Sequence, residues 1–263
     1  MDYEAGSLSA GHSPPYAKFQ PPDPAATLTA PDACLVTCEH GGNRIPPRYR
    51  ACFRGHEALL HTHRGYDIGA LRVARELAAA LGAPLLAATA SRLLIDLNRS
   101  RGHPRLYSEA TRSLPPALRH EILERYYLPY RTHAESRIAR AIEGGARVLH
   151  VSCHSFTPQL DGSIRNTDFG LLYDPARPLE AGLCRRWGRA LDARAAPLRV
   201  RMNYPYRGTA DGFTTYLRKR FPADRYLGIE LEINQKHVLE GAQHWRAVRK
   251  AIIGALQATP VLL

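Results

Sequence analysis

Several stretches of the sequence place polar, chemically active side chains directly after an apolar run. These side chains are Glu39 and His40, then Asp96, Asn98 and Arg99, then His154 and Ser155, and finally Glu230, Glu232 and Asn234. Two histidines and a carboxylate that meet at one edge of a sheet can bind zinc and leave one coordination position open for water. A further glutamate can deprotonate that water. An arginine can hold an anionic group through a forked pair of hydrogen bonds.

Each of these residues also has an ordinary structural alternative. His40 can be a surface or capping residue, His154 a buried histidine with satisfied hydrogen bonds, and Arg99 the ion-pair partner of a nearby acid. The pair Glu230 and Glu232 is the stronger signal, because residues two apart in a strand face the same side. Two carboxylates on one buried face cost free energy unless cations or a metal accompany them.

The scaffold that must position these side chains is predicted to alternate strands and helices. Apolar runs predict strands over residues 33–38, 84–90, 92–97, 147–155, 168–174, 198–203 and 225–234. Helical spacing predicts helices over residues 69–83, 118–145, 178–193 and 242–258, with an interruption at Pro129. This alternation indicates an α/β fold of three layers, in which helices cover a central mixed, mostly parallel sheet. Ligands gather at the carboxyl ends of strands in such folds, which gives the polar side chains a place to meet.

Composition bounds the domain organisation and the class of protein. Residues 1–31 are rich in Pro, Ala, Ser and Gly and are expected to form an irregular arm, whereas residues 32–263 are expected to form a single domain. The net charge is +12, but only four of the 36 basic residues are lysines and the arginines are spread along the chain, so no nucleic-acid partner is expected.

Location and assembly are constrained less strongly. Five irregularly spaced cysteines fit reduced thiols in a cytoplasmic protein. No apolar run is long enough for a membrane span, and no signal-peptide pattern is present at the N-terminus. The sequence leaves the oligomeric state open.

The ordered motifs resemble a known family. "VSCHSFTP", "IDLNRS" and "GIELEIN" resemble the histidine-ligand strand end, the Asn-Arg pair and the glutamate-bearing strand of zinc carboxypeptidases. The N-formylglutamate amidohydrolase family is a closer match, through "EHGGNRIP", "YDIGA", "RLLIDLNRS", "HSFTP", "NYPYRGTADG" and "LEIN". These motifs occur in order from about residue 35 to 240. The resemblance implies a zinc exopeptidase-like fold.

The resemblance also implies roles for individual residues. It implies a Zn²⁺ ion held by His40, Asp67 and His154, and Glu232 as the general base. It implies that Asn98 and Arg99 grip a substrate carboxylate, with Arg207 and Asp211 near the substrate. The chain departs from the carboxypeptidase pattern at Asn43, where that pattern has a glutamate ligand.

Structural alternatives stay open beside these implied roles. Asp67 is the leading replacement for the missing glutamate ligand and Glu39 is the alternative, although an acid at position 67 can also simply begin a helix. Glu230 is then a structural acid. The glycines of the 203–212 stretch can serve turns alone, whatever Arg207 and Asp211 do.

The resulting hypothesis is a zinc-dependent amide hydrolase that removes a formyl or other small acyl group from an N-acyl amino acid such as N-formylglutamate. Its partner is then a small anionic molecule. The alternatives are a metallopeptidase that acts on short peptides, a homologue that binds a ligand without turnover, and a basic nucleic-acid binder.

Overall fold

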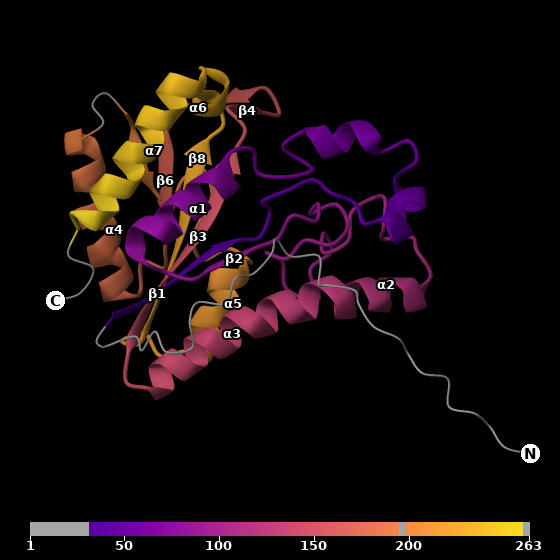
Figure 1. Ribbon diagram of the computed structural model, residues 1–263, viewed down its shortest axis with the longest axis horizontal. Helices are drawn as coiled ribbons and strands as arrows, with labels where there is room; N and C mark the ends of the chain where they lie inside the picture. The colour runs from indigo at the N-terminus through magenta and orange to yellow at the C-terminus, as the bar shows by residue number, and fades with distance from the viewer. Residues whose placement is uncertain (1–31, 195–197, 260–263) are drawn as a thin grey trace, which may run out of the picture.

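The computed structural model describes residues 32–194 and 198–259, so the arm expected over residues 1–31 lies outside the described residues (Figure 1). A six-stranded sheet forms the centre, in the order β2-β1-β3-β8-β6-β7. Its strands are β1 (Asp32–Cys38), β2 (Leu85–Ala87), β3 (Arg147–Phe156), β6 (Phe169–Leu172), β7 (Val200–Met202) and β8 (Tyr226–Asn234). Neighbouring strands are parallel except for β6 and β8, which are antiparallel. The predicted mixed, mostly parallel sheet is therefore confirmed.

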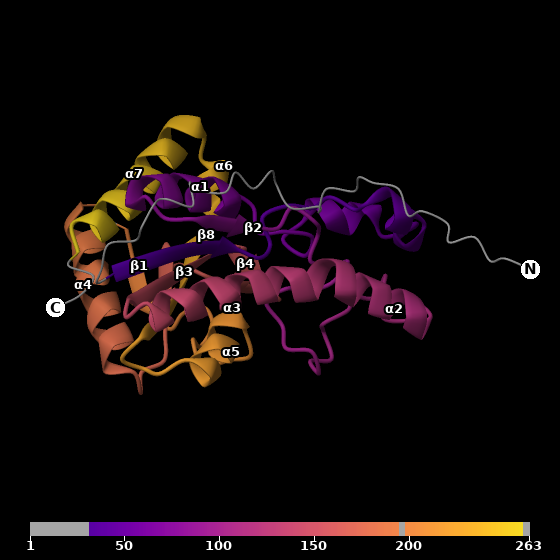
Figure 2. The same ribbon diagram turned by 60° about the horizontal axis from the view of Figure 1, so that its bottom comes forward.

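Helices cover both faces of this sheet. On one face lie α1 (Ala70–Leu81), α4 (Pro178–Arg194) and α7 (Ala242–Gln257), whose apolar side chains form one core with the strands. On the other face lie α3 (Leu128–Glu143) and α5 (Phe213–Arg220). Figure 2 shows α1 and α7 above the strands and α3 and α5 below them. The three layers of the α/β fold are thus confirmed.

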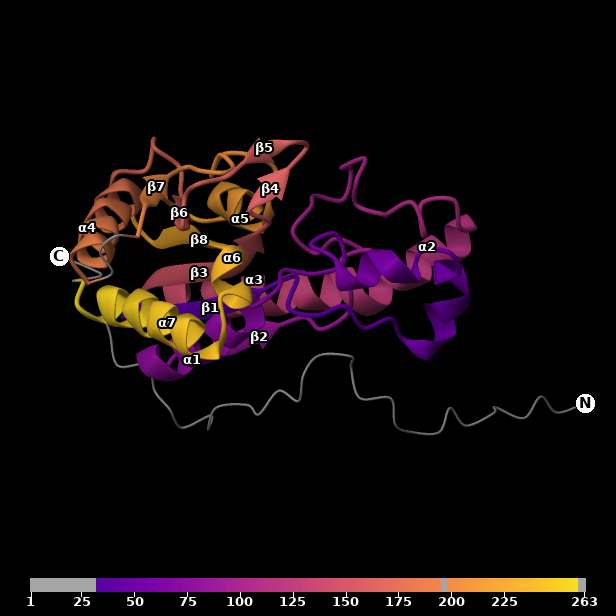
Figure 3. The same cartoon turned by 90° about the horizontal axis from the view of Figure 1, so that it is seen from above.

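Shorter elements complete the chain. They are the 3-10 helices η1 (Pro47–Phe53) and η2 (Glu57–His61), the small hairpin of β4 (Gln159–Leu160) and β5 (Ser163–Ile164), and α6 (Lys236–Leu239). Figure 3 shows η1 and η2 gathered with α2 (Pro116–Ile122) at one end of the molecule, beside the strands. No helix in the described ranges has the length and apolar character that crossing a membrane requires.

The sheet has one apolar and one partly polar face. Along β3, Leu149, Val151 and Cys153 join the core beneath α1, α4 and α7. The alternate residues, among them His150 and His154, face α3 and α5 because successive side chains of a strand point to opposite sides. The second face therefore carries buried polar groups toward the carboxyl ends of the strands.

His150 lies in the middle of this polar face and is fully buried. Its Nε2 atom lies 2.8 Å from the Thr37 hydroxyl and its Nδ1 atom lies 2.7 Å from the Tyr226 hydroxyl. Burial lowers the pKa of the His150 imidazole to about 4. The ring is therefore neutral at pH 7 and links β1, β3 and β8 through hydrogen bonds.

This neutral histidine predicts acid sensitivity. The unfolded chain takes up the proton near the ordinary histidine pKa of about 6.5, whereas the folded chain resists it until about pH 4. The contribution of His150 to the free energy of unfolding should therefore fall by about 3 kcal/mol as pH drops through this window, and no further below it. Urea unfolding of the wild type and of His150→Gln at several pH values measures this, with His120→Gln as an exposed control. Equal pH dependence in wild type and His150→Gln would contradict the prediction.

The strand predicted over residues 92–97 is wrong. This stretch forms successive turns, in which the Leu94 N–H donates to the Ser91 carbonyl and the Arg99 N–H donates to the Asp96 carbonyl. Leu93, Leu94, Ile95 and Leu97 are nevertheless all buried in the core on the α3 side of the sheet. An apolar run of this length reports burial, and it cannot distinguish a strand from a buried turn.

The helix predicted over residues 118–145 divides into three parts. The chain forms α2 (Pro116–Ile122), a π-helical turn η3 (Leu123–Tyr127) and then α3, in which Pro129 lies in the first turn. The interruption at Pro129 is confirmed, and it takes the form of a widened turn because proline has no N–H to continue the ladder. The helix α5 has no counterpart among the predicted elements, which contain a loop up to residue 213.

Candidate active site

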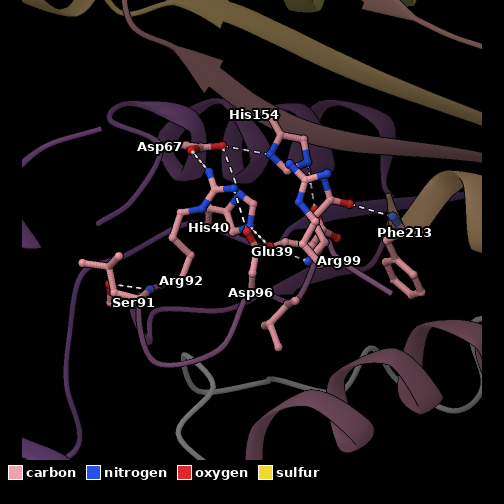
Figure 4. A network of polar contacts seen from close by, with 12 residues as sticks. Glu39, His40, Asp67, Ser91, Arg92, Asp96, Arg99, His154 and Phe213 are labelled. Carbon is pink, nitrogen blue, oxygen red and sulfur yellow. Dashed lines mark hydrogen bonds and ion pairs between the residues drawn. The ribbon is translucent and has the colours of Figure 1, made fainter. Parts of the chain in front are cut away.

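Three chain segments bring His40, Asp67 and His154 together at the carboxyl edge of the sheet (Figure 4). His40 follows β1, Asp67 precedes α1, and His154 lies near the end of β3. One ligand atom from each residue lies within 4.8 Å of the others. His154 Nδ1 lies 2.8 Å and His40 Nδ1 lies 3.4 Å from the same oxygen, Asp67 Oδ2. All three residues are at most 3% exposed.

The loop after β1 reaches this position because its glycines permit a close backbone approach. A Cβ on Gly42 would lie 2.5 Å from the Thr89 carbonyl oxygen, and one on Gly41 would lie 2.9 Å from that of Ala88. The Asp67 N–H donates to the His40 carbonyl at 2.9 Å. The two glycines thus allow the loop to pack directly against the backbone of residues 88–89. The hydrogen bond from the Asp67 N–H holds His40 beside Asp67.

A second carboxylate orients His40. Its Nε2 atom lies 2.7 Å from Asp96 Oδ1. The Arg92 guanidinium joins the two acids, with 2.7 Å to Asp96 Oδ2 and 3.3 Å to Asp67 Oδ1. Carboxylates that accept the second N–H of a ligand histidine fix its tautomer and ring orientation. Asp96 therefore keeps the lone pair of His40 on Nδ1, the nitrogen that faces Asp67.

His154 is oriented in the same way by Glu39. Its Nε2 atom lies 3.2 Å from Glu39 Oε2 and 2.9 Å from the Ser152 hydroxyl. Glu39 also accepts hydrogen bonds from Ser152 at 2.6 Å and from the Tyr130 hydroxyl at 3.0 Å. Glu39 thus contacts the nitrogen of His154 that points away from Asp67, where a carboxylate can orient the ring as Asp96 orients His40.

The charges of these groups depend on one another. Burial alone would raise the pKa of Asp67 and of Glu39, but the nearby histidines outweigh burial and hold the pKa of both carboxyl groups below their ordinary values. Burial would lower the pKa of His154, and the hydrogen bonds to Asp67 and Glu39 instead raise it well above its ordinary value. The cluster therefore concentrates negative charge that a cation can balance.

Glu232 lies next to His154 on the neighbouring strand. In the parallel pairing of β3 and β8, His154 stands opposite Glu232. Burial raises the pKa of Glu232 to about 8, and its Oε2 atom is buried without a hydrogen-bond partner among the described residues. Glu230, on the same face, instead accepts a hydrogen bond from the Thr214 hydroxyl. Of the two acids, Glu232 has the free oxygen.

The predicted substrate-binding residues are brought together only in part. The Asn98 Oδ1 atom accepts the Phe213 N–H at 2.6 Å, which leaves the Asn98 amide N–H groups free to donate. Arg99 donates to the Asp211 carbonyl at 2.8 Å, and the Asp211 carboxylate accepts the Ser100 N–H at 3.1 Å. Asp211 therefore positions residues 98–100.

Arg207 is separate from this group. Its side chain is exposed and makes no hydrogen bond or ion pair with the described part of the chain. The structure thus joins Asn98, Arg99 and Asp211 and leaves Arg207 outside their contacts.

Sequence reasoning missed three residues of this network, namely Arg92, Tyr130 and Ser152. Arg92 could have been noticed, because it stands four residues before Asp96 at the start of the "RLLIDLNRS" motif. Ser152 could also have been noticed, because it lies two residues before His154 in the same strand and therefore faces the same side, as Glu230 and Glu232 do. Tyr130 reaches Glu39 from α3, and no local sequence pattern marks that contact.

The residues present fit a metal ion. His40 Nδ1 is buried without a hydrogen-bond partner among the described residues, and it points at a carboxylate oxygen and a second imidazole nitrogen. Two imidazoles and a carboxylate, each histidine backed by a further acid, are a donor set typical of zinc in enzymes.

The protein has a mixed sheet covered by helices, with buried histidines and carboxylates at the carboxyl ends of the strands. This arrangement is typical of α/β enzymes that bind their ligands at that edge of the sheet. The model of the N-formylglutamate amidohydrolase family matches residues 32–239, and the chain belongs to this family. The family resemblance seen in the sequence is thereby confirmed, and the protein is an amide hydrolase.

Two solved structures show the same fold. The gene product Atu2144 from Agrobacterium tumefaciens is 30% identical with a TM-score of 0.71, over 86% of this chain and 90% of that chain. An N-formylglutamate amidohydrolase from Ralstonia eutropha JMP134 is 21% identical with a TM-score of 0.62, over 87% of this chain and 93% of that chain. No curated protein matches the chain in sequence.

Proposed function

We propose that the protein is a zinc-dependent amidohydrolase that removes a formyl or other small acyl group from an N-acyl amino acid such as N-formylglutamate. The observation that carries the proposal is the buried group of His40, Asp67 and His154 with the unpartnered Glu232 carboxylate beside it. The family name supplies the substrate class. The cytoplasmic location and the absence of a nucleic-acid partner stay predictions.

In this proposal His40, Asp67 and His154 hold the zinc ion, and Asp96 and Glu39 orient the two histidines. A bound zinc ion would supply Lewis-acid polarisation of the amide carbonyl and would lower the pKa of water at the site. A nearby cation also opposes the effect of burial on Glu232, because it favours the ionised carboxylate. Arg92 keeps Asp67 and Asp96 ionised and in place.

Glu232 is the general base and then the general acid. Its free Oε2 atom takes a proton from the attacking water, and the resulting carboxylic acid returns that proton to the leaving amine when the C–N bond breaks. Its raised pKa suits both steps, since a group that titrates near the working pH can accept and release a proton.

Asn98 and Arg99 bind the substrate carboxylate in this proposal. The amide N–H groups of Asn98 and the guanidinium N–H groups of Arg99 that do not contact Asp211 are available as donors. A forked contact to a carboxylate fixes the direction of the substrate, which places its amide relative to the metal ligands.

This role predicts the behaviour of Arg99→Lys. Lysine keeps the charge but loses the fork, so KM should rise roughly tenfold or more while zinc content stays unchanged. Steady-state kinetics on free and amidated substrates measures the effect, with Arg101→Lys as an exposed neighbouring control. Amidation should cost the wild type far more than it costs Arg99→Ala. Equal costs in both enzymes would remove Arg99 from carboxylate recognition.

The proposed function is tested by a release assay. Zinc-loaded enzyme is given N-formyl and N-acetyl derivatives of glutamate, aspartate and an uncharged amino acid, together with di- and tripeptides. We expect formate or acetate release from the anionic N-acyl amino acids. Cleavage of the peptides alone would indicate a peptidase, and binding without any turnover would indicate a ligand-binding homologue. Either result would overturn the proposed function.

A further inference from the structure

A second histidine cluster lies outside the candidate active site. His237 belongs to α6, His244 belongs to the first turn of α7, and Glu240 lies in the short connection between them. One ligand atom from each residue lies within 4.8 Å of the others. Figure 1 shows α6 and α7 next to each other at one end of the sheet, with α1 beside α7.

The contacts of these atoms converge on one point. His237 Nδ1 lies 2.9 Å from His244 Nε2, and His244 Nε2 lies 3.0 Å from Glu240 Oε2. The His244 Nε2 atom carries at most one proton, so it can donate a full hydrogen bond to only one of its two neighbours, His237 Nδ1 or Glu240 Oε2. A divalent cation bound to all three atoms would replace that single shared proton and satisfy the three lone pairs together.

The hydrogen bonds of His237 leave one of its ring nitrogens available to bind a metal ion. Its Nε2 atom lies 3.0 Å from Asp168 Oδ1, and Asp168 is itself buried and accepts the Arg199 N–H at 2.6 Å. The Asp168 carboxylate therefore holds the proton of His237 on Nε2 and leaves the lone pair on Nδ1, facing His244. This carboxylate-histidine arrangement is typical of metal sites in proteins.

The position of the ring is also fixed. The His237 side chain is 2% exposed and stacks on Phe169, with ring centroids 5.8 Å apart. His244 and Glu240 are 37% and 48% exposed, so a cation can enter from solvent. The cluster thus combines one rigid, buried ligand with two accessible ones.

We propose that His237, Glu240 and His244 form a second binding site for a divalent transition metal such as Zn²⁺, with Asp168 as the carboxylate that orients His237. Two imidazoles and one carboxylate select this class of metal over Mg²⁺ and Ca²⁺, which prefer oxygen ligands. Glu240 and His244 lie outside the residues that match the family model, so the site does not follow from family membership.

The second site has a structural role in this proposal. It joins α6 to the start of α7, and Asp168 connects both to the beginning of β6. Val238 of α6 and Trp245 of α7 pack closely against Gly69, which is two residues after Asp67. A Cβ atom on Gly69 would lie within 3.1 Å of both side chains. A metal at the second site therefore fixes the corner against which the Asp67 loop packs.

Metal titration of tag-free, chelator-treated protein tests the proposal. Calorimetric titration with Zn²⁺ should give two equivalents for the wild type, one for His244→Ala and a weakened second equivalent for Glu240→Gln. His120→Ala is the matched control, because His120 and Glu124 form an exposed pair with the same four-residue spacing but have no third ligand among the described residues. It should keep two equivalents.

Two further outcomes separate this proposal from the first site. In His154→Ala, Zn²⁺ should still raise the melting temperature, and the added His244→Ala substitution should abolish that rise. A wild type that binds only one equivalent, which survives His154→Ala and disappears in His244→Ala, would support the second site and contradict the first. Equal zinc content in wild type and folded His244→Ala, or no rise in melting temperature in His154→Ala, would overturn the second site.

Discussion

Glu232→Gln should lose about 100-fold or more in kcat while it keeps its zinc and nearly all of its substrate affinity. Glutamine preserves the shape of the side chain and removes its basicity. The group that is lost is the free Oε2 atom of a buried carboxylate whose strand position is opposite His154. Parallel measurement of kcat, KM and zinc content distinguishes a lost base from a lost metal or a lost binding contact.

Glu230→Gln is the matched control for this variant. Glu230 is on the same strand and the same face, but its carboxylate is already engaged by the Thr214 hydroxyl. We expect Glu230→Gln to lower the free energy of unfolding and to change kcat by no more than a few-fold. Near wild-type turnover in Glu232→Gln together with an inactive but folded Glu230→Gln would reverse the two roles. Activity in both variants would exclude a carboxylate base on β8.

His154→Ala should strip the protein of active-site zinc. The imidazole contributes one of the three ligand atoms gathered around Asp67, and a two-ligand remnant binds zinc weakly. Metal analysis after dialysis against zinc-free buffer measures the loss in His154→Ala and in His40→Ala. Because the proposed second site would also bind zinc, both variants are best compared in a His244→Ala background. Full zinc content in folded His154→Ala, in that background, would show that the ligand set is wrong.

The two candidate acids differ in the same assay. Asp67→Asn removes a proposed ligand, so its zinc affinity should fall almost as far as that of His154→Ala. Glu39→Gln removes the charge of one partner of His154 Nε2 and leaves the proposed ligands in place, and changes of this kind cost roughly 10- to 100-fold in metal affinity. A greater loss in Glu39→Gln than in Asp67→Asn would make Glu39 the ligand.

Much of the fold could be predicted from local pattern. β1, β3 and β8 have long apolar runs, and α1 and α7 have clear helical spacing, so the predicted bounds of each lie within a few residues of the observed ones. The strand prediction for residues 92–97 is wrong because the apolar residues of this stretch are buried in turns. A run of buried residues has no periodicity that identifies a strand. The hairpin β4–β5 and the helix α5 lie in stretches whose polar composition suits loops equally well.

The part of the candidate site that lies at strand ends could be predicted from the sequence. His154 and Glu232 follow from the rule that parallel strands present their carboxyl ends together, and their register confirms that they are neighbours. Asp67 lies on a connecting loop, where no periodicity applies, and only the family resemblance pointed to it. The orienting roles of Arg92 and Tyr130 depend on contacts across more than one layer, which sequence spacing does not encode.

The order of strands has a consequence for how the chain is made. β8 lies between β3 and β6 in the sheet, yet it follows all the other described strands in the sequence. While the ribosome is still producing residues 157–225, β1, β2 and β3 can pair, and β6 can pair with β7, but no strand yet joins these two groups. The free edge of β3 then exposes unpaired backbone groups, which favour aggregation. The strand that closes this edge also carries Glu232, the proposed base, so we expect hydrolytic activity only from a chain whose sheet is complete.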